Sequence, residues 1–266
     1  MRVNARAGAR PIGGRHPLVL LSPGFTLNRA TLTTLAEELA SKGYVVALVD
    51  HAYESYGTAF PGGRTLTCVA SEVIERAPSD EAEKELLAKA TEGRGTNLSF
   101  VVGELTRWKR WKMIDPRRIG AAGHSLGGNA AAVAMAADRR IRAGVDMDGS
   151  FFAPVPRSGL GKWPFLMLGT KAQHSPGTVD TSRPPAWQRL DGWKRWLTVA
   201  DSGHFTFVRR QSRGGLPESL TKKGPAPRWV RAFFCERQAG TMFSACGPFW
   251  PWTMSKDTFW PSFSSR

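Results

Sequence analysis

A serine between two glycines is the feature of this chain most able to do chemistry. Residues 123–128 read GHSLGG and contain the pattern G-x-S-x-G, with Ser125 at its centre. A serine hydroxyl becomes a nucleophile only when it stands clear of the backbone beside a base, and a sharp strand-to-helix turn presents it in this way. Residues 118–122 (RIGAA) predict a short buried strand, and residues 129–137 (NAAAVAMAA) predict the helix. The pattern therefore predicts a nucleophile elbow that carries Ser125.

A nucleophilic serine needs a histidine base, and the chain has five histidines. In folds that use such an elbow, the base follows the last strand of the sheet. His204, in the segment DSGHF, comes directly after the predicted strand 196–199. His124 lies inside the elbow, and the remaining three histidines lie upstream of this strand. The order along the chain therefore favours His204 as the base.

The base needs a carboxylate that orients the imidazole and stabilises its charged form. Asp148 directly follows the predicted strand 141–147, whereas the strand 165–168 is followed by no carboxylate before Asp180. Asp146 shares a strand face with Asp148 and is interpreted as structural. Asp148 is the preferred acid, and Asp180 is the alternative.

An ester-cleaving serine also needs two backbone N–H groups aimed at the oxygen on which negative charge develops. The amide of Leu126 follows the nucleophile at the positive end of the elbow helix. A second donor is expected from the loop after an early strand. Residues 21–25 (LSPGF) fit, because Gly24 permits a tight turn and leaves Phe25 as the donor.

The elements that must position these residues alternate between strand and helix. Such alternation predicts an α/β fold with a mainly parallel central sheet and helices on both faces. No large lid domain is expected, and residues 51–67 are interpreted as an irregular excursion. Further predicted strands are 18–21 and 44–49, and further predicted helices are 29–41, 79–91, 97–112 and 226–235.

The length of 266 residues suits a single domain over 1–266. Within it, residues 1–16 are a lead-in and 236–266 an irregular C-terminal tail. Hydrophobic residues at 41% and charged residues at 22% argue against a disordered chain, and no apolar run is long enough to span a bilayer. The first residues lack the apolar centre of a signal peptide, so a cytoplasmic protein is expected unless a signal has been removed.

The net charge of +15 is expected to favour weak electrostatic association with anionic surfaces. No nucleic-acid-binding motif accompanies this charge, so no specific nucleic-acid partner is expected. The cysteine and histidine spacings match no metal site, so neither a metal nor another cofactor is expected. Of Cys68, Cys235 and Cys246, the last two are the most plausible disulfide pair, with free thiols as the alternative.

Residues from about 17 to 207 resemble the α/β-hydrolase family that contains the plasma-type platelet-activating-factor acetylhydrolases and related actinobacterial lipases. The similarity is carried by the segments SPGF, TLTTLAEELASKGYVVALVDH, GHSLGGNAAAVAMAADRRIRAGVDMDGSFF and SGHFTF. In the family, the acid lies 23 residues after the serine, where this chain has Asp148. The resemblance implies the triad Ser125, Asp148 and His204, the oxyanion donors Phe25 and Leu126, and metal-independent ester hydrolysis.

The chain departs from the family pattern at both ends. Such relatives usually have further strands before the SPGF segment, but only about sixteen residues precede that strand here. This departure implies either an N-terminal truncation or a smaller sheet. The tail after Phe234 also fits the family poorly.

Together, these residues predict a serine carboxylic-ester hydrolase that acts through an acyl-enzyme on short-to-medium acyl esters, either small molecules or lipids. A cutinase-like polyester hydrolase and a binding module with a vestigial site are the alternatives. The oligomeric state is left open. Five side chains are interpreted as lining the substrate site, namely Tyr53, Phe60, His124, Phe151 and Phe152.

Overall fold

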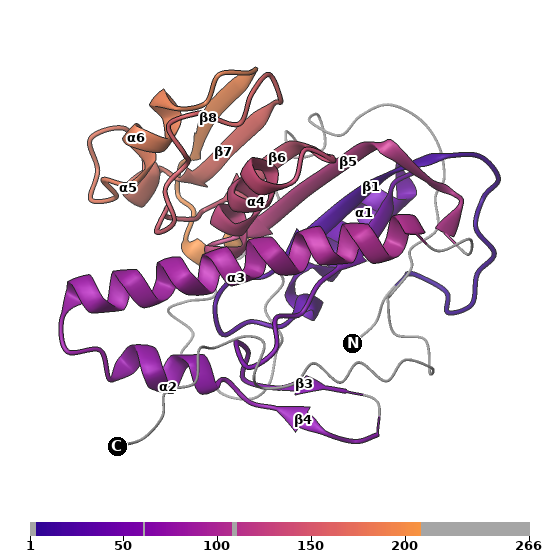
Figure 1. Ribbon diagram of the computed structural model, residues 1–266, viewed down its shortest axis with the longest axis horizontal. Coiled ribbons are helices and arrows are strands. Elements are labelled where there is room, and N and C mark those ends of the chain that lie inside the picture. The colour runs from indigo at the N-terminus through magenta and orange to yellow at the C-terminus, as the bar shows by residue number, and fades with distance from the viewer. Residues whose placement is uncertain (1–3, 61, 108–110, 209–266) are drawn as a thin grey trace.

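The computed structural model describes residues 4–60, 62–107 and 111–208. Its main sheet has six strands in the order β2-β1-β5-β6-β7-β8, and every neighbouring pair is parallel (Figure 1). The predicted helix 226–235, the tail and the pair Cys235 and Cys246 lie outside the described residues. The strands are β1 (His16–Ser22), β2 (Val45–Leu48), β5 (Ile114–His124), β6 (Ile141–Met147), β7 (Phe165–Thr170) and β8 (Lys194–Val199).

Two hydrophobic clusters cover the two faces of this sheet. Because neighbouring side chains on a strand point to opposite faces, Leu20 belongs to one cluster and Leu21 to the other. The first cluster includes buried residues of two long helices, and the second includes buried residues of the helical segment that follows β1. This arrangement confirms the predicted α/β architecture, with helices on both faces of a parallel sheet.

Several helices that lie between the strands in the chain pack on these two faces (Figure 1). No helix within the described ranges is long and apolar enough to cross a membrane. The excursion at 51–67 contains a short antiparallel pair, β3 (Thr58–Ala59) and β4 (Thr65–Leu66). The helices are η1 (Arg29–Leu32), α1 (Thr33–Ser41), α2 (Val69–Glu75), α3 (Asp80–Arg107), α4 (Leu126–Ala137), α5 (Lys171–His174), α6 (Arg183–Gln188) and η3 (His204–Phe207).

The two helices predicted at 79–91 and 97–112 form one continuous helix, α3, of 28 residues. Glycine weakens an isolated helix by about 1 kcal/mol, so Gly93 and Gly95 favour a break at the sequence level. The structure shows why Gly95 is accommodated. A Cβ atom there would lie 2.5 Å from Cγ1 of Val133, so the missing side chain lets α3 approach α4 closely. Tertiary packing therefore overrides local propensity at this point.

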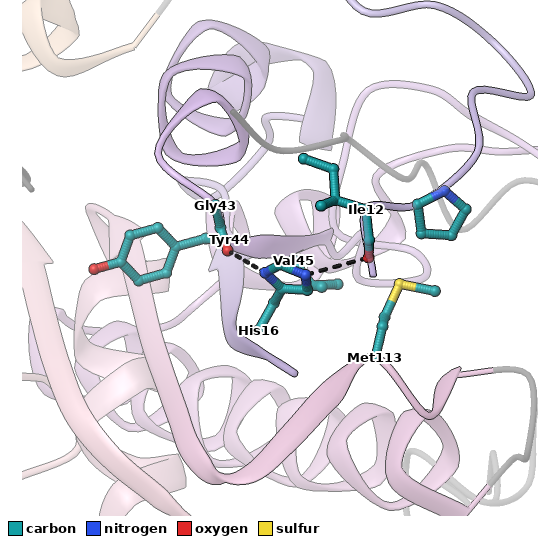
Figure 2. A pocket seen from close by; sticks show the side chains of 7 residues that line it. Ile12, His16, Gly43, Tyr44, Val45 and Met113 are labelled. Atoms are coloured by element: carbon teal, nitrogen blue, oxygen red, sulfur yellow. Dashed lines mark hydrogen bonds between the residues drawn. The ribbon is translucent and has the colours of Figure 1, made fainter. Parts of the chain in front are cut away.

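The amino-terminal end of β1 borders a small cavity (Figure 2). The cavity has a volume of about 10 Å³, which is room for about one water molecule. The imidazole of His16 lies at its edge, with Nδ1 3.1 Å from the carbonyl oxygen of Gly43 and Nε2 3.3 Å from that of Ile12. This end of the parallel sheet is opposite the end at which the candidate catalytic residues gather.

Candidate active site

Ser125 lies at the sharp turn between β5 and α4, as the elbow pattern predicts. Its backbone has φ 54° and ψ −126°, a conformation that a side-chain-bearing residue rarely adopts. Two backbone hydrogen bonds hold the turn. The Ser125 amide donates to the carbonyl of Met147 at 2.8 Å, and the Gly128 amide donates to the carbonyl of Ser125 at 2.9 Å.

The glycines around Ser125 are required by steric contact. A Cβ atom on Gly123 would overlap the backbone of Gly127, and a Cβ atom on Gly127 would overlap the carbonyl of Ser22. A Cβ atom on Gly128 would overlap the carboxylate of Asp146. The pattern G-x-S-x-G-G therefore reflects the close approach of the elbow to β1 and β6.

Asp148 and His204 come together although 56 residues separate them. Asp148 follows β6 directly, and His204 begins the short helix η3 after β8. The Nδ1 atom of His204 donates a hydrogen bond of 2.6 Å to Oδ2 of Asp148. This contact leaves Nε2 as the ring nitrogen available to act as a base, which is the geometry a catalytic histidine and its acid require.

The loop after β1 approaches the elbow. A Cβ atom on Gly24 would lie 3.3 Å from Cβ of Ser125, so the glycine lets this loop pass beside the serine. Phe25, the predicted oxyanion donor, is half-buried and follows this glycine directly. Leu126 is the first residue of α4, where helical N–H groups have no partner within the helix.

A buried arginine holds the loop in place. Arg94 of α3 has no solvent exposure and donates from Nη1 to the carbonyl of Pro23 at 2.6 Å. Its Nε donates to a carboxylate oxygen of Glu54 at 2.7 Å. Burial and the charge of Arg94 lower the pKa of His51 well below its ordinary value, and the neutral His51 ring lies 2.9 Å from the hydroxyl of Ser22. Sequence reasoning missed these groups, because nothing in the spacing connects them to the loop.

Asp148 also binds a second histidine that sequence reasoning left in an upstream loop. His174 ends α5, and its Nδ1 donates a hydrogen bond of 2.6 Å to Oδ1 of Asp148. The backbone amide of Thr170 donates to the same oxygen at 2.6 Å. Burial raises the pKa of Asp148, but the hydrogen bonds from His174, His204 and Thr170 outweigh it and hold that pKa well below its usual range.

Asp180, the alternative acid, and Asp146, interpreted as structural, bind other partners. Asp180 faces Nε2 of His174 at 3.2 Å and accepts a hydrogen bond from Ser150. It is therefore connected to His204 through His174 and Asp148. Asp146 is fully buried in an ion pair with Arg183, whose Nε also donates to the carbonyl of Gly149 at 3.0 Å. This pairing matches the structural interpretation of Asp146.

Two side chains interpreted as pocket walls have other surroundings. Phe151 is 5% exposed and packs in the core, with its ring centroid 6.3 Å from that of Phe165. His124 is fully buried, and its Nε2 donates to the carbonyl of His204 at 2.9 Å. Burial, followed by the charge of His204, lowers the pKa of His124 to about 4, so this ring is neutral and supports the segment that carries His204.

The remaining predicted wall residues are half-buried. Tyr53 has a left-handed backbone at φ 64°, and Phe60 lies between β3 and β4. Phe152 is also half-buried. Within the part of the chain that the structure describes, no group of three metal-ligating side chains could hold a metal ion.

Several known proteins to which this chain is similar are named as esterases or acetylhydrolases. The family model "Platelet-activating factor acetylhydrolase, isoform II" matches residues 2–62. A ferulic acid esterase from Streptomyces cinnamoneus has a structure with a TM-score of 0.66 and 42% identity, covering 76% of this chain and 56% of that chain. A probable 1-alkyl-2-acetylglycerophosphocholine esterase from Arthroderma benhamiae is 30% identical over 208 residues. The chain is thus similar in sequence to these enzymes, and its fold resembles that of the solved esterase.

A mammalian relative is less similar in sequence. The platelet-activating factor acetylhydrolase of Cavia porcellus is 24% identical over 219 residues, or 74% of this chain. The Arthroderma alignment covers 73% of this chain, and each of these two alignments covers 49% of the relative. The chain thus spans about half the length of the curated relatives it matches.

Proposed function

We propose that the chain is a serine carboxylic-ester hydrolase that works through an acyl-enzyme. The observation that carries the proposal is the 2.6 Å hydrogen bond between Asp148 and His204, formed at the sheet edge where the strained turn of Ser125 also lies. A buried carboxylate that holds one nitrogen of a half-exposed imidazole leaves the other nitrogen free to move protons. The sequence similarity to named esterases supports the same chemistry.

The proposed mechanism assigns one task to each residue. His204 takes the proton of Ser125 as the serine oxygen attacks the ester carbonyl, and Asp148 stabilises the resulting imidazolium. The amides of Phe25 and Leu126 bind the oxyanion. His204 then passes the proton to the departing alcohol. In the second half, a water molecule gives its proton to His204 and attacks the acyl-enzyme. His204 then returns this proton to the serine oxygen as the acid leaves.

Two substrate classes are proposed for this site. Short-to-medium acyl esters, including acetyl esters of lipids, are favoured by the names of the fungal and mammalian relatives. Feruloyl esters are the second candidate, because the solved ferulic acid esterase shares 42% of its residues with this chain in the aligned region.

Covalent labelling with a fluorophosphonate tests the proposal directly. The wild-type protein should be labelled at Ser125, and the Ser125→Ala variant should not. Activity on p-nitrophenyl acetate, butyrate and octanoate and on methyl ferulate should then rank the substrate classes, and a chelator should leave the rates unchanged. A folded wild-type protein that neither reacts with the probe nor cleaves any of these esters would favour a vestigial binding module.

A further inference from the structure

His174 occupies a buried position between two carboxylates. Its side chain is 5% exposed, and those of Asp148 and Asp180 are 0% and 8% exposed. Its Nδ1 lies 2.6 Å from Oδ1 of Asp148, and its Nε2 lies 3.2 Å from Oδ2 of Asp180. Both ring nitrogens therefore face carboxylate oxygens.

The protonation state of His174 follows from these contacts. An ionised carboxylate only accepts hydrogen bonds, and a neutral imidazole has a single N–H. Two carboxylate partners can both be satisfied only when the ring carries two N–H groups, as an imidazolium. Burial lowers the pKa of His174, but the hydrogen bonds to Asp148 and Asp180 outweigh it and raise the pKa to about 9.

The charged groups around His174 come from several elements. Asp148 follows β6, Asp180 precedes α6, and Arg183 of α6 lies near enough to oppose the charge of His174. Asp146 of β6 lies beyond Arg183 and is paired with it. The backbone of His174 is fixed as well, because Nε1 of Trp196 donates to its carbonyl at 2.7 Å.

The two carboxylate oxygens of Asp148 accept hydrogen bonds from two different histidines. Oδ2 accepts from His204, whereas Oδ1 accepts from His174 and from the amide of Thr170. The group that orients the proposed base is thus held rigidly from its opposite side. One carboxylate thus separates a positive charge on His174 from the ring of His204.

We propose that His174 is a charged positioning residue. Its imidazolium clamps Asp148 opposite His204 and lowers the pH at which the serine centre becomes active. This inference rests on the proposed function, because it concerns the base of that reaction. It assigns to His174 a role that neither the elbow pattern nor the order of the triad predicts.

The pH dependence of kcat/KM separates this role from a purely structural one. His174→Asn places an amide donor near the position of Nδ1 and removes the charge. The acid limb of the profile should then move to higher pH by about one unit, as expected when a unit charge that one carboxylate separates from the base is removed in a partly solvated protein site. Asp180→Asn removes a neighbouring negative charge and should move the limb the other way, by a few tenths of a unit. A structural role would lower the rates of both variants without opposite shifts.

A third variant separates the effect of the charge on His174 from the effect of its hydrogen bond to Asp148. His174→Phe keeps the ring volume but removes both the charge and the donor to Asp148. It should lower kcat at least tenfold below His174→Asn, with KM changed by less than twofold, because orientation of the base is lost and substrate contacts are kept. Equal kcat values in the two variants would show that the clamp on Asp148 does not matter.

The protonation state of His174 can also be measured without enzyme turnover, which tests the proposal even if the variants fold poorly. Nitrogen-15 NMR of the histidine rings in Ser125→Ala should show both nitrogens of His174 protonated from about pH 5 to 8, with the signal assigned by its loss in His174→Asn. An unprotonated nitrogen at pH 7, or an unmoved acid limb in an active His174→Asn enzyme, would overturn the proposal. An inactive wild type whose His174 remains doubly protonated would instead refute the esterase function.

Discussion

The amide of Ser125 donates a hydrogen bond of 2.8 Å to the carbonyl of Met147, the last residue before Asp148. The proposed nucleophile and its acid are therefore joined through one backbone contact. The contact follows from register, because β5 and β6 are parallel and His124 pairs with Met147. The residues after both strands then emerge at the same edge of the sheet, where ligands commonly bind in parallel α/β folds.

Ser125→Ala should abolish ester hydrolysis while the fold is retained. Only a hydroxyl is lost, and removal of a triad nucleophile commonly costs on the order of 10⁶ in rate. Steady-state kinetics on a p-nitrophenyl ester, with thermal unfolding as the check on folding, would measure this. Activity above a few per cent of wild type in clean protein would contradict the assignment of Ser125.

Asp148→Asn and Asp180→Asn should differ strongly in kcat at the plateau of the pH profile. The first change removes the acceptor that fixes the His204 tautomer and should cost roughly 10⁴ in turnover. The second leaves Asp148 and its bond to His204 in place and should remain within a few-fold of wild type. The opposite ranking would move the acid to the later loop.

Arg94→Met should slow catalysis without touching the proposed triad. The change removes the 2.6 Å hydrogen bond to the carbonyl of Pro23, so the loop that presents Phe25 is less well positioned. We expect kcat to fall by roughly tenfold to a hundredfold, because small displacements of an oxyanion donor are costly. KM should change little.

The same change should also lower the free energy of unfolding by about 3 kcal/mol, because it leaves the carboxylate of Glu54 without its partner. Denaturant titration measures this. The double variant Arg94→Met/Glu54→Gln should recover part of the stability but none of the rate. Recovery of both the stability and the rate would mean that Arg94 affects catalysis only by stabilising the fold.

The stabilisation of the fold by His174 should be lost at alkaline pH. Its pKa in the folded protein is raised to about 9, by hydrogen bonds to Asp148 and Asp180 that outweigh burial, whereas a histidine in an unfolded chain ionises near about 6.5. Because the folded pKa is the higher, the stabilisation is fully present below about pH 6.5 and is lost as the pH rises through about 9. Relative to His174→Asn, the wild type should lose up to about 3 kcal/mol of unfolding free energy between these pH values. Parallel stability curves for the two proteins would contradict the charge assignment.

The elbow and the strands near it could be predicted from the sequence, because local steric rules determine them. The glycines around Ser125 are required by short-range contacts, and buried strands of a parallel sheet appear as short apolar runs, so the elbow and the strands near it follow from spacing alone. Asp148 is the first residue after a predicted strand, and in the structure it contacts His204, the histidine that chain order favours.

Only the tertiary structure decided which distant residues support this site. Arg94 reaches Pro23 across 71 positions, and His174 reaches Asp148 across 26, and neither separation matches a helical or strand period. Periodicity reports which face of an element is buried, but it cannot name the partner across the interface. Strand register and helix packing set those pairs, and the same packing kept α3 continuous through Gly95. The sequence determines the order of the strands and helices and the position of the elbow. The network that holds Asp148 forms only when the sheet has assembled.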